Sequence, residues 1–209
     1  MLFIRKIENT TLQAIANALR GRQSQGDADK IEVDDFATVA QDRTDSLKGT
    51  IDRTATSVTI PSGVTSIGTS AFYGCSNLAS VTIPSSATSI GYASFQDCIK
   101  LKNVTILNGV TSIGGNAFFN CSNLESITIP SGVTSIGSKA FGNCSNLRTI
   151  NLPSTITTMD GRPADCFSGI NPNAVINCGF AQGAVSGAPW GAPAGVTINY
   201  GVTGGDSNE

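Results

Sequence analysis

The chain has 209 residues, a formal net charge of −2 and a sequence pI of about 5.1. Charged residues make up only 13% of it, about half the usual fraction, whereas 23 residues are glycine. The absence of a basic stripe argues against nucleic acid as a partner. No run of about 18 apolar residues occurs, which argues against membrane insertion. The composition is typical of stacked β structure with many turns.

Residues 1–43 are expected to form a small helical module. Apolar residues at helical spacing predict one helix after Asn9 or Thr10, which Gly21 ends, and a second, shorter helix that starts near Asp34 or Asp35. A hairpin of about 40 residues lies near the lower limit for an independent core. Its apolar face should therefore pack either on the rest of the chain or on a larger assembly. The residues predicted for this assembly face are Leu12, Ile15, Leu19, Phe36 and Val39.

The first twenty residues do not predict a secretory signal. They place Glu8 and several polar residues where such a signal needs an unbroken apolar core. Residues 44–57 follow as a degenerate coil, because Leu47, Ile51 and Ala55 continue the apolar pattern that precedes Val58. We expect this segment to cap the first full repeat.

Residues 58–149 consist of four consecutive copies of a 23-residue unit, the first of which is VTIPSGVTSIGTSAFYGCSNLAS. A fixed period of this size indicates a solenoid in which one coil stacks on the next. Each copy predicts a half-buried strand ended by proline, a second short extended stretch, and a turn of α- or 3₁₀-helix that carries Phe and Cys. Residues at one position of successive copies are called a column below. The Phe column is Phe72, Phe95, Phe118 and Phe141, and the Cys column is Cys75, Cys98, Cys121 and Cys144.

The cysteine count does not indicate a disulfide framework, because four of the six cysteines belong to one column. We expect free, buried thiols. The chain has no histidine and no C-x-x-C pair, so neither a zinc site nor a histidine-assisted nucleophile is expected. No Walker, dinucleotide-binding or EF-hand motif occurs. The sequence therefore predicts no catalytic, cofactor or metal site, and a protein that is not an enzyme.

Positions that vary between the copies are expected to face water. They include an aromatic row that is either a binding patch or a set of surface aromatics without a role. The candidate binding surface consists of Tyr73, Tyr92, Gln96 and Phe119. On another face, Thr59, Thr82, Thr105, Thr128 and Asn151 should form a polar ladder that stabilises a sheet.

A fifth coil begins at Ile150 and loses the repeat pattern at DGRPADCFSGINPN, where Cys166 and Phe167 stand in inverted order. Residues 174–178 and 196–200 predict two strands on either side of a loop that holds Trp190, the only tryptophan. We expect residues 172–209 to cover the open end of the solenoid, which spans residues 58–171, and to finish in a frayed tail.

The repeated unit N-L-x-S-V-T-I-P-x-x-V-T-S-I-G-x-x-A-F-x-x-C, between Asn77 and Cys144, strongly resembles the BspA-type leucine-rich repeat. The resemblance implies a mainly β solenoid with short helices, and exported members of that family are often bacterial surface adhesins. The flanks resemble a narrower group. TLQAIANALRGRQ and DDFATVAQ are similar to the N-terminal helical module of tail or baseplate proteins in phages of Gram-positive bacteria, and residues 179–201 are similar to the closing segment of tail-region leucine-rich-repeat proteins.

These resemblances imply a virion structural protein of the tail tip, baseplate or a fibre. Its N-terminal module would bind other virion proteins, and its solenoid would bind a protein or glycan on the host surface. Such a protein would be made in the host cytoplasm, and a homotrimer would suit a tail fibre. Two alternatives stay open: a bacterial surface adhesin of the BspA type, and a purely structural or decorating virion subunit.

Overall fold

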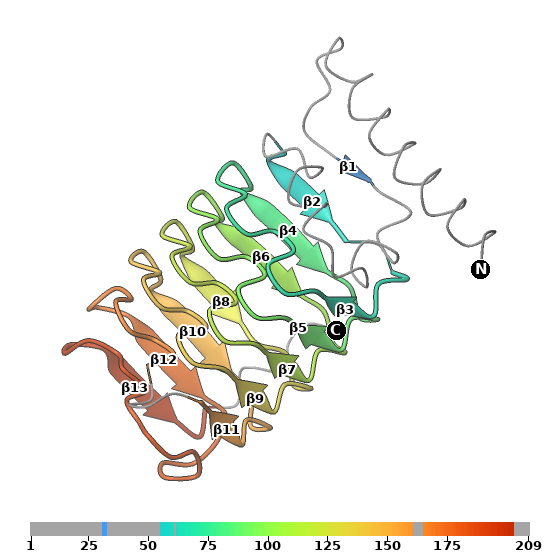
Figure 1. Cartoon of the computed structure of the whole chain (residues 1–209). Coiled ribbons are helices and arrows are strands. Elements are labelled where there is room, and N and C mark those ends of the chain that lie inside the picture. The colour runs from blue at the N-terminus through green and yellow to red at the C-terminus, as the bar shows by residue number, and fades with distance from the viewer. Residues whose placement is uncertain (1–30, 33–54, 61, 161–164, 203–209) are drawn as a thin grey trace.

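A computed structural model describes residues 31–32, 55–60, 62–160 and 165–202, which form a parallel β-solenoid (Figure 1). Each coil contributes one strand of three or four residues and most also contribute one of two. The strands of three or four residues are β2 (Ser57–Thr59), β4 (Ser80–Ile83), β6 (Asn103–Ile106), β8 (Ser126–Thr128), β10 (Thr149–Leu152), β12 (Val175–Cys178) and β13 (Thr197–Tyr200). The two-residue strands are β3 (Ser66–Ile67), β5 (Ser89–Ile90), β7 (Ser112–Ile113), β9 (Ser135–Ile136) and β11 (Thr158–Met159), together with β1 (Ile31–Glu32) near the N-terminus.

The strands pair in parallel, and the repeat period sets their register. Val58 lies opposite Val81, and Val81 lies opposite Val104, so each residue faces its counterpart 23 positions later. The two-residue strands form one continuous sheet in the order β11-β9-β7-β5-β3. The other side of the solenoid carries two sheets, β1-β2-β4-β6 and β13-β12-β10-β8, so the described strands β6 and β8 are not paired with each other.

Alternation along the strands places the core between the sheets. In β4, Val81 and Ile83 are buried whereas Thr82 is half-buried, as expected for a strand with one solvated face. The predicted polar ladder is confirmed at its C-terminal end, where the Asn151 amide donates to the Thr128 hydroxyl at 3.1 Å and the Asn177 amide donates to Asn151 at 2.9 Å. Asn199 continues the ladder on β13.

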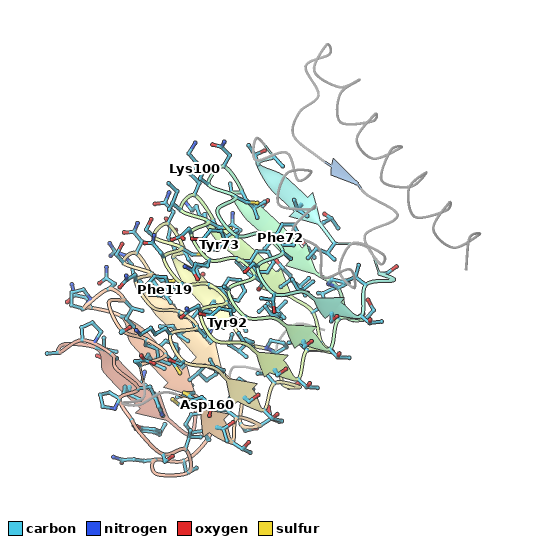
Figure 2. The ribbon with its side chains drawn as sticks, in the orientation of Figure 1. Phe72, Tyr73, Tyr92, Lys100, Phe119 and Asp160 are labelled. Carbon is cyan, nitrogen blue, oxygen red and sulfur yellow. The ribbon has the colours of Figure 1, made fainter. Side chains whose placement is uncertain are left out.

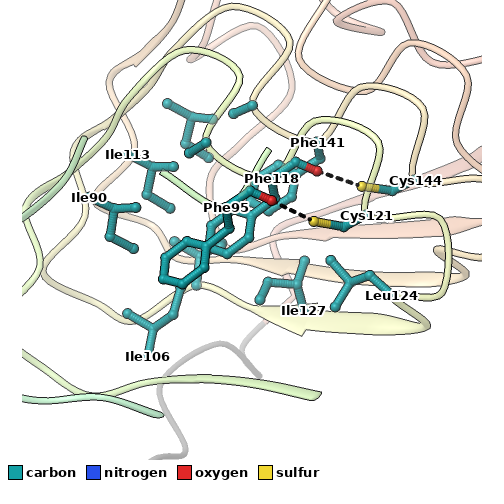
Figure 3. Packing of buried hydrophobic residues seen from close by; sticks show 14 of the residues in the cluster. Ile90, Phe95, Ile106, Ile113, Phe118, Cys121, Leu124, Ile127, Phe141 and Cys144 are labelled. Carbon is teal, nitrogen blue, oxygen red and sulfur yellow. Dashed lines mark hydrogen bonds between the residues drawn. The ribbon is translucent and has the colours of Figure 1, made fainter. Parts of the chain in front are cut away.

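The Phe column forms a continuous stack through the core, as shown in part in Figure 3. Ring centroids lie 4.9 Å apart for Phe72 and Phe95, 5.2 Å for Phe95 and Phe118, and 5.4 Å for Phe118 and Phe141. Phe167 adds a fifth ring 5.8 Å from Phe141. The inversion at Cys166 therefore keeps a phenylalanine in the stack although the repeat pattern is lost.

The prediction of a helical turn around Phe and Cys is wrong, since no helix is present within residues 55–60, 62–160 and 165–202. The backbone N–H groups alternate between two acceptors. Tyr73 N–H donates to the Ser70 carbonyl three residues earlier, whereas Phe72 N–H donates to the carbonyl of Ser94 in the next coil. Positive φ angles of 57° at Ser70 and 68° at Gly74 also interrupt helical geometry twice per coil. The segment is therefore a hydrogen-bonded turn tied to its neighbour.

The column that contains Gly91, Gly114 and Gly137 requires glycine because the coils approach closely there. A Cβ on Gly91 would lie 2.7 Å from the Ile67 carbonyl oxygen, and one on Gly137 would lie 2.4 Å from the Gly115 nitrogen. Both neighbours are backbone atoms that belong to the preceding coil. The repeated glycine thus follows from coil spacing.

The predicted C-terminal strands are confirmed as β12 and β13, which extend the sheet beyond β10. Trp190 is fully buried in the loop between them, and its indole N–H donates to the Ser186 carbonyl at 2.9 Å. Its ring meets Phe167 edge-on, with the centroids 6.4 Å apart. The segment therefore closes the end of the phenylalanine stack.

At the other end, β1 pairs in parallel with β2, a strand that the sequence patterns do not predict. The expected helical hairpin, its assembly face (Leu12, Ile15, Leu19, Phe36 and Val39) and most of the expected cap at residues 44–57 lie outside the described residues. The domain boundaries near residues 43, 57 and 171 stay predictions.

Candidate functional site

The predicted binding residues all lie in the turns that connect the two-residue strands to the next longer strands, and Figure 2 shows Tyr73, Tyr92 and Phe119 there. Tyr92 is 55% exposed and Tyr73 is 37% exposed. Gln96 and Phe119 are half-buried. The four side chains therefore reach the surface to different extents, and a binding role for them stays a prediction.

Two of these rings cover glycines of the following coil. A Cβ on Gly142 would lie 2.9 Å from Cδ2 of Phe119, and one on Gly115 would lie 3.5 Å from Cδ2 of Tyr92. The Tyr92 hydroxyl also accepts a hydrogen bond from the Asn116 amide at 3.1 Å. An aromatic ring over a glycine shields backbone that a side chain would otherwise cover. The geometry thus gives Phe119 and Tyr92 a packing role in the solenoid.

Tyr73 belongs to a polar cluster centred on Asp97. A hydrogen bond to the Asp97 carboxylate and its negative charge raise the pKa of the Tyr73 phenol. The Asn120 amide donates to the same carboxylate at 2.8 Å, and Gln96 donates to its other oxygen at 3.4 Å. Asp97 and Asn120 have positive φ angles, which these residue types tolerate better than most. The cluster therefore stabilises the turns of adjacent coils.

The Cys column is buried and consists of free thiols, as predicted. The thiols of Cys98, Cys121 and Cys144 each donate to the carbonyl of a phenylalanine in the preceding coil, at 3.1, 3.2 and 3.2 Å. Figure 3 shows the bonds of Cys121 with Phe95 and of Cys144 with Phe118. Burial raises the pKa of Cys144 to about 12. A thiol that stays protonated at neutral pH is a poor nucleophile and a poor metal ligand.

No group of three or more potential metal ligands of the His, Cys, Asp and Glu types occurs within the described part of the chain. The same residues contain no helix with the length and apolar character required to span a membrane.

Charged residues form a cation-rich edge in the segments before the longer strands. There Lys102 pairs with Glu125 at 3.2 Å, and Lys100 donates to the neutral Asn77 side chain at 2.9 Å.

Sequence reasoning overlooked two exposed apolar residues near β6. Ile99 is 42% exposed and Leu107 is 36% exposed. A signal was available, because the columns of Ile99 and Leu107 otherwise contain serine and proline, respectively. Ile99 precedes β6 and Leu107 follows it, and β6 is the strand that does not pair with β8.

Three solved structures of leucine-rich-repeat proteins are similar to this chain. A T. pallidum leucine-rich-repeat protein is 27% identical with a TM-score of 0.56, and the match covers 70% of each chain. One from Bacteroides ovatus is 38% identical with a TM-score of 0.50, over 60% of this chain and 34% of that one. A leucine-rich cell surface protein from Faecalibacterium prausnitzii is 28% identical with a TM-score of 0.51, over 69% of this chain and 48% of that one. The latter two matches span about a third and about half of those proteins.

The comparison with curated protein sequences found no match. Residues 52–172 match the model of the BspA type leucine-rich repeat region in six copies, which is more than half of the chain. Leucine-rich-repeat solenoids are typically non-enzymatic scaffolds for protein interaction, because stacked coils present an extended surface of variable positions. With its 23-residue coils, phenylalanine stack and parallel register, the chain belongs to the BspA-type leucine-rich repeat family.

Proposed function

We propose that this chain is a non-enzymatic attachment protein that uses its solenoid to bind a protein or glycan on a cell surface. The observation that carries the proposal is that constant and variable positions occupy different places in each coil. Constant positions are buried or form turns, and the variable positions lie on the outside. A rigid body with a variable surface suits recognition. The similarity to a leucine-rich cell surface protein supports the same role.

Binding of the full-length, fluorescently labelled chain to intact Gram-positive bacteria and cultured epithelial cells tests the proposal by flow cytometry. We expect saturable binding that excess unlabelled chain competes away. Pretreating the cells with protease or with glycosidase identifies the receptor class. A protein of the same size without repeats serves as the control. Binding that never saturates, or no more binding than the control shows on either cell type, contradicts an attachment role.

A second proposal places the chain in the tail of a phage virion, with the N-terminal module bound to other virion proteins. It is supported by the resemblance of TLQAIANALRGRQ and of residues 179–201 to tail-region proteins. Deleting residues 1–43 should abolish incorporation into purified particles, as measured by mass spectrometry. The melting temperature of the truncated chain should differ little from that of the full chain. Undiminished incorporation of the truncated chain counts against this assignment. The copy number per particle tests the trimer expected of a fibre.

A further inference from the structure

The coil around β6 departs from the other coils at its surface. Ile99 stands in a column that otherwise contains Ser76, Ser122 and Ser145. Leu107 stands in a column whose other described members are the prolines Pro84, Pro130 and Pro153. Serine is polar, and these three prolines are buried. Only this coil therefore places large apolar side chains in the solvent at both positions.

The backbone explains how the fold tolerates Leu107. Its N–H donates to the Ile83 carbonyl at 3.0 Å, a bond that proline is unable to make. Leucine thus lengthens the pairing of β6 with β4 by one bond while its side chain stays 36% exposed. The substitution keeps the solenoid intact and changes its surface.

The exposed side chains between these two residues complete a strip that begins in the segment before β6 and continues along β6. Lys100, Lys102, Asn103 and Thr105 are all exposed. Val104 is only half-buried, whereas its counterparts Val81 and Ile127 are buried. We define the β6 strip as Ile99, Lys100, Lys102, Asn103, Thr105 and Leu107. The strip borders the place where the sheet is interrupted between β6 and β8.

The edge that carries the strip is positively charged. The short segments that lead into the longer strands carry three basic residues, Lys100, Lys102 and Arg148. Within the described coils, Glu125 is the one acidic residue in these segments. Three positive charges and one negative charge give the edge a net charge of +2. Lys102 shares its charge with Glu125, whereas the partner of Lys100 is the neutral Asn77. Lys100 lies at this edge in Figure 2. The free charge favours an anionic partner.

We propose that the β6 strip binds an extended, acidic polypeptide segment with apolar side chains. The inference rests on the proposed attachment function and names the surface and the partner chemistry. Ile99 and Leu107 supply apolar contacts at the two ends, and Lys100 and Lys102 pair with carboxylates between them. The four residues of β6 are about 13 Å long at ~3.3 Å per residue, and the strip continues beyond them to Ile99 and Leu107, so the partner segment must be longer than four residues to contact both ends. A glycan fits less well, because the strip has no aromatic ring on which a sugar would stack.

Fluorescence anisotropy tests this with the full chain and labelled peptides of about ten residues, long enough to cover the strip at ~3.3 Å per residue. The probe peptide alternates Asp and Leu, and the comparison peptides alternate Lys with Leu and Asp with Ser. We expect only the Asp–Leu peptide to bind. Raising the salt from about 50 to about 300 mM should weaken it severalfold, because surface charges are screened.

The test variant is Ile99→Ser, Lys100→Asn and Leu107→Ser combined. Serine and asparagine are the residues of the other coils in the columns of Ile99 and Lys100, and serine at position 107 keeps the N–H that the proline of that column would remove. It should lower the affinity at least tenfold without lowering the melting temperature. Tyr73→Gln is the matched control, because it removes an exposed aromatic side chain outside the strip and introduces the residue that Gln96 provides in its column. It should leave affinity unchanged.

Four outcomes overturn the proposal: an unchanged affinity in the triple variant, equal binding of the Lys–Leu peptide, no peptide binding by the unaltered chain, or displacement of the peptide by a neutral glycan. The cell-binding assay is run on the same proteins. Cells that bind the triple variant as well as the unaltered chain exclude the strip as the attachment surface but leave the attachment function standing. Peptide binding without cell binding contradicts only the attachment function.

Discussion

Replacing Ser94 with alanine should stabilise the protein, although Ser94 is fully buried. Its hydroxyl oxygen is buried and, among the described side chains, has no hydrogen-bond partner. The other three residues of its column are Ala71, Ala117 and Ala140, so the coil accepts alanine without rearrangement. The backbone bonds of Ser94 do not involve the side chain and should persist.

The magnitude follows from the cost of an unpaired hydroxyl. Burying such a group without a partner costs about 1–3 kcal/mol, and Ser94→Ala removes it. The free energy of unfolding should therefore rise by at least about 1 kcal/mol. For a chain of this size, each kcal/mol raises the melting temperature by about 2–4 °C. The reciprocal substitution Ala117→Ser, at an equally buried position, should destabilise by a similar amount.

Both effects are measured by thermal and guanidinium unfolding followed by circular dichroism. An unchanged or lower stability of Ser94→Ala would show that the hydroxyl has a favourable partner and would refute the reasoning. A neutral Ala117→Ser would refute it independently, because the same group is then tolerated in the same environment. We expect the two substitutions to change the free energy of unfolding by similar amounts in opposite directions.

Phe118→Ala should lower the free energy of unfolding by about 3–5 kcal/mol, because the ring is fully buried and stacked on both sides; Tyr73→Ala, at an exposed position, should cost below about 1 kcal/mol in the same denaturant titration. Equal losses would contradict the assignment of core and surface. Gly114→Ala should destabilise strongly because its Cβ would lie 2.8 Å from a backbone carbon of Gly91. At Gly183 no atom lies within 4 Å of the added Cβ, so Gly183→Ala should cost only the strain of its positive φ of 85°, about 1–2 kcal/mol. Comparing the melting temperatures of the two variants tests whether coil spacing sets the larger requirement at Gly114. The raised thiol pKa values also predict alkaline lability. Burial raises the pKa of the Cys144 thiol to about 12, whereas in the unfolded chain this pKa is about 8.5. The buried neutral thiol therefore contributes fully to the free energy of unfolding below about pH 8.5, and this contribution is lost as the pH rises toward about 12. Unfolding free energies measured across this range should decline, and less so in Cys144→Ala; a flat profile would argue against buried neutral thiols.

Much of the fold could be predicted from the sequence because the repeat displays its own constraints four times. A side chain that must fill the same place in each coil recurs at 23-residue intervals, as Phe72 and Cys75 do. The strands β12 and β13 were also predictable, since AVINC and VTINY repeat the alternation of the earlier strands.

The turn segment shows where local patterns fail. Its apolar spacing resembles a helix, but Ser70, Ala93 and Lys139 adopt positive φ angles that these residue types seldom favour. Those angles persist because the N–H groups of the segment bond to the next coil, as Phe72 does with Ser94. The preference of single residues is thereby overridden by contacts 22 residues away.

The candidate surface residues could also be predicted only in part. Comparison of columns identifies Tyr92, Phe119, Ile99 and Leu107 as unusual residues, but it does not reveal which of them are committed to packing. In the folded chain Phe119 lies over Gly142, whereas Leu107 remains in solvent. The difference depends on the neighbouring coil, which sits one full period away.

The sequence by itself determined the period, the parallel register and the residues of the core, because each is dictated by repetition along the chain. Only the tertiary structure decided the turn geometry, the interruption between β6 and β8 and the exposure of Ile99. These features arise from contacts between coils. Such contacts depend on distances and directions across the stack, and a linear pattern does not contain them.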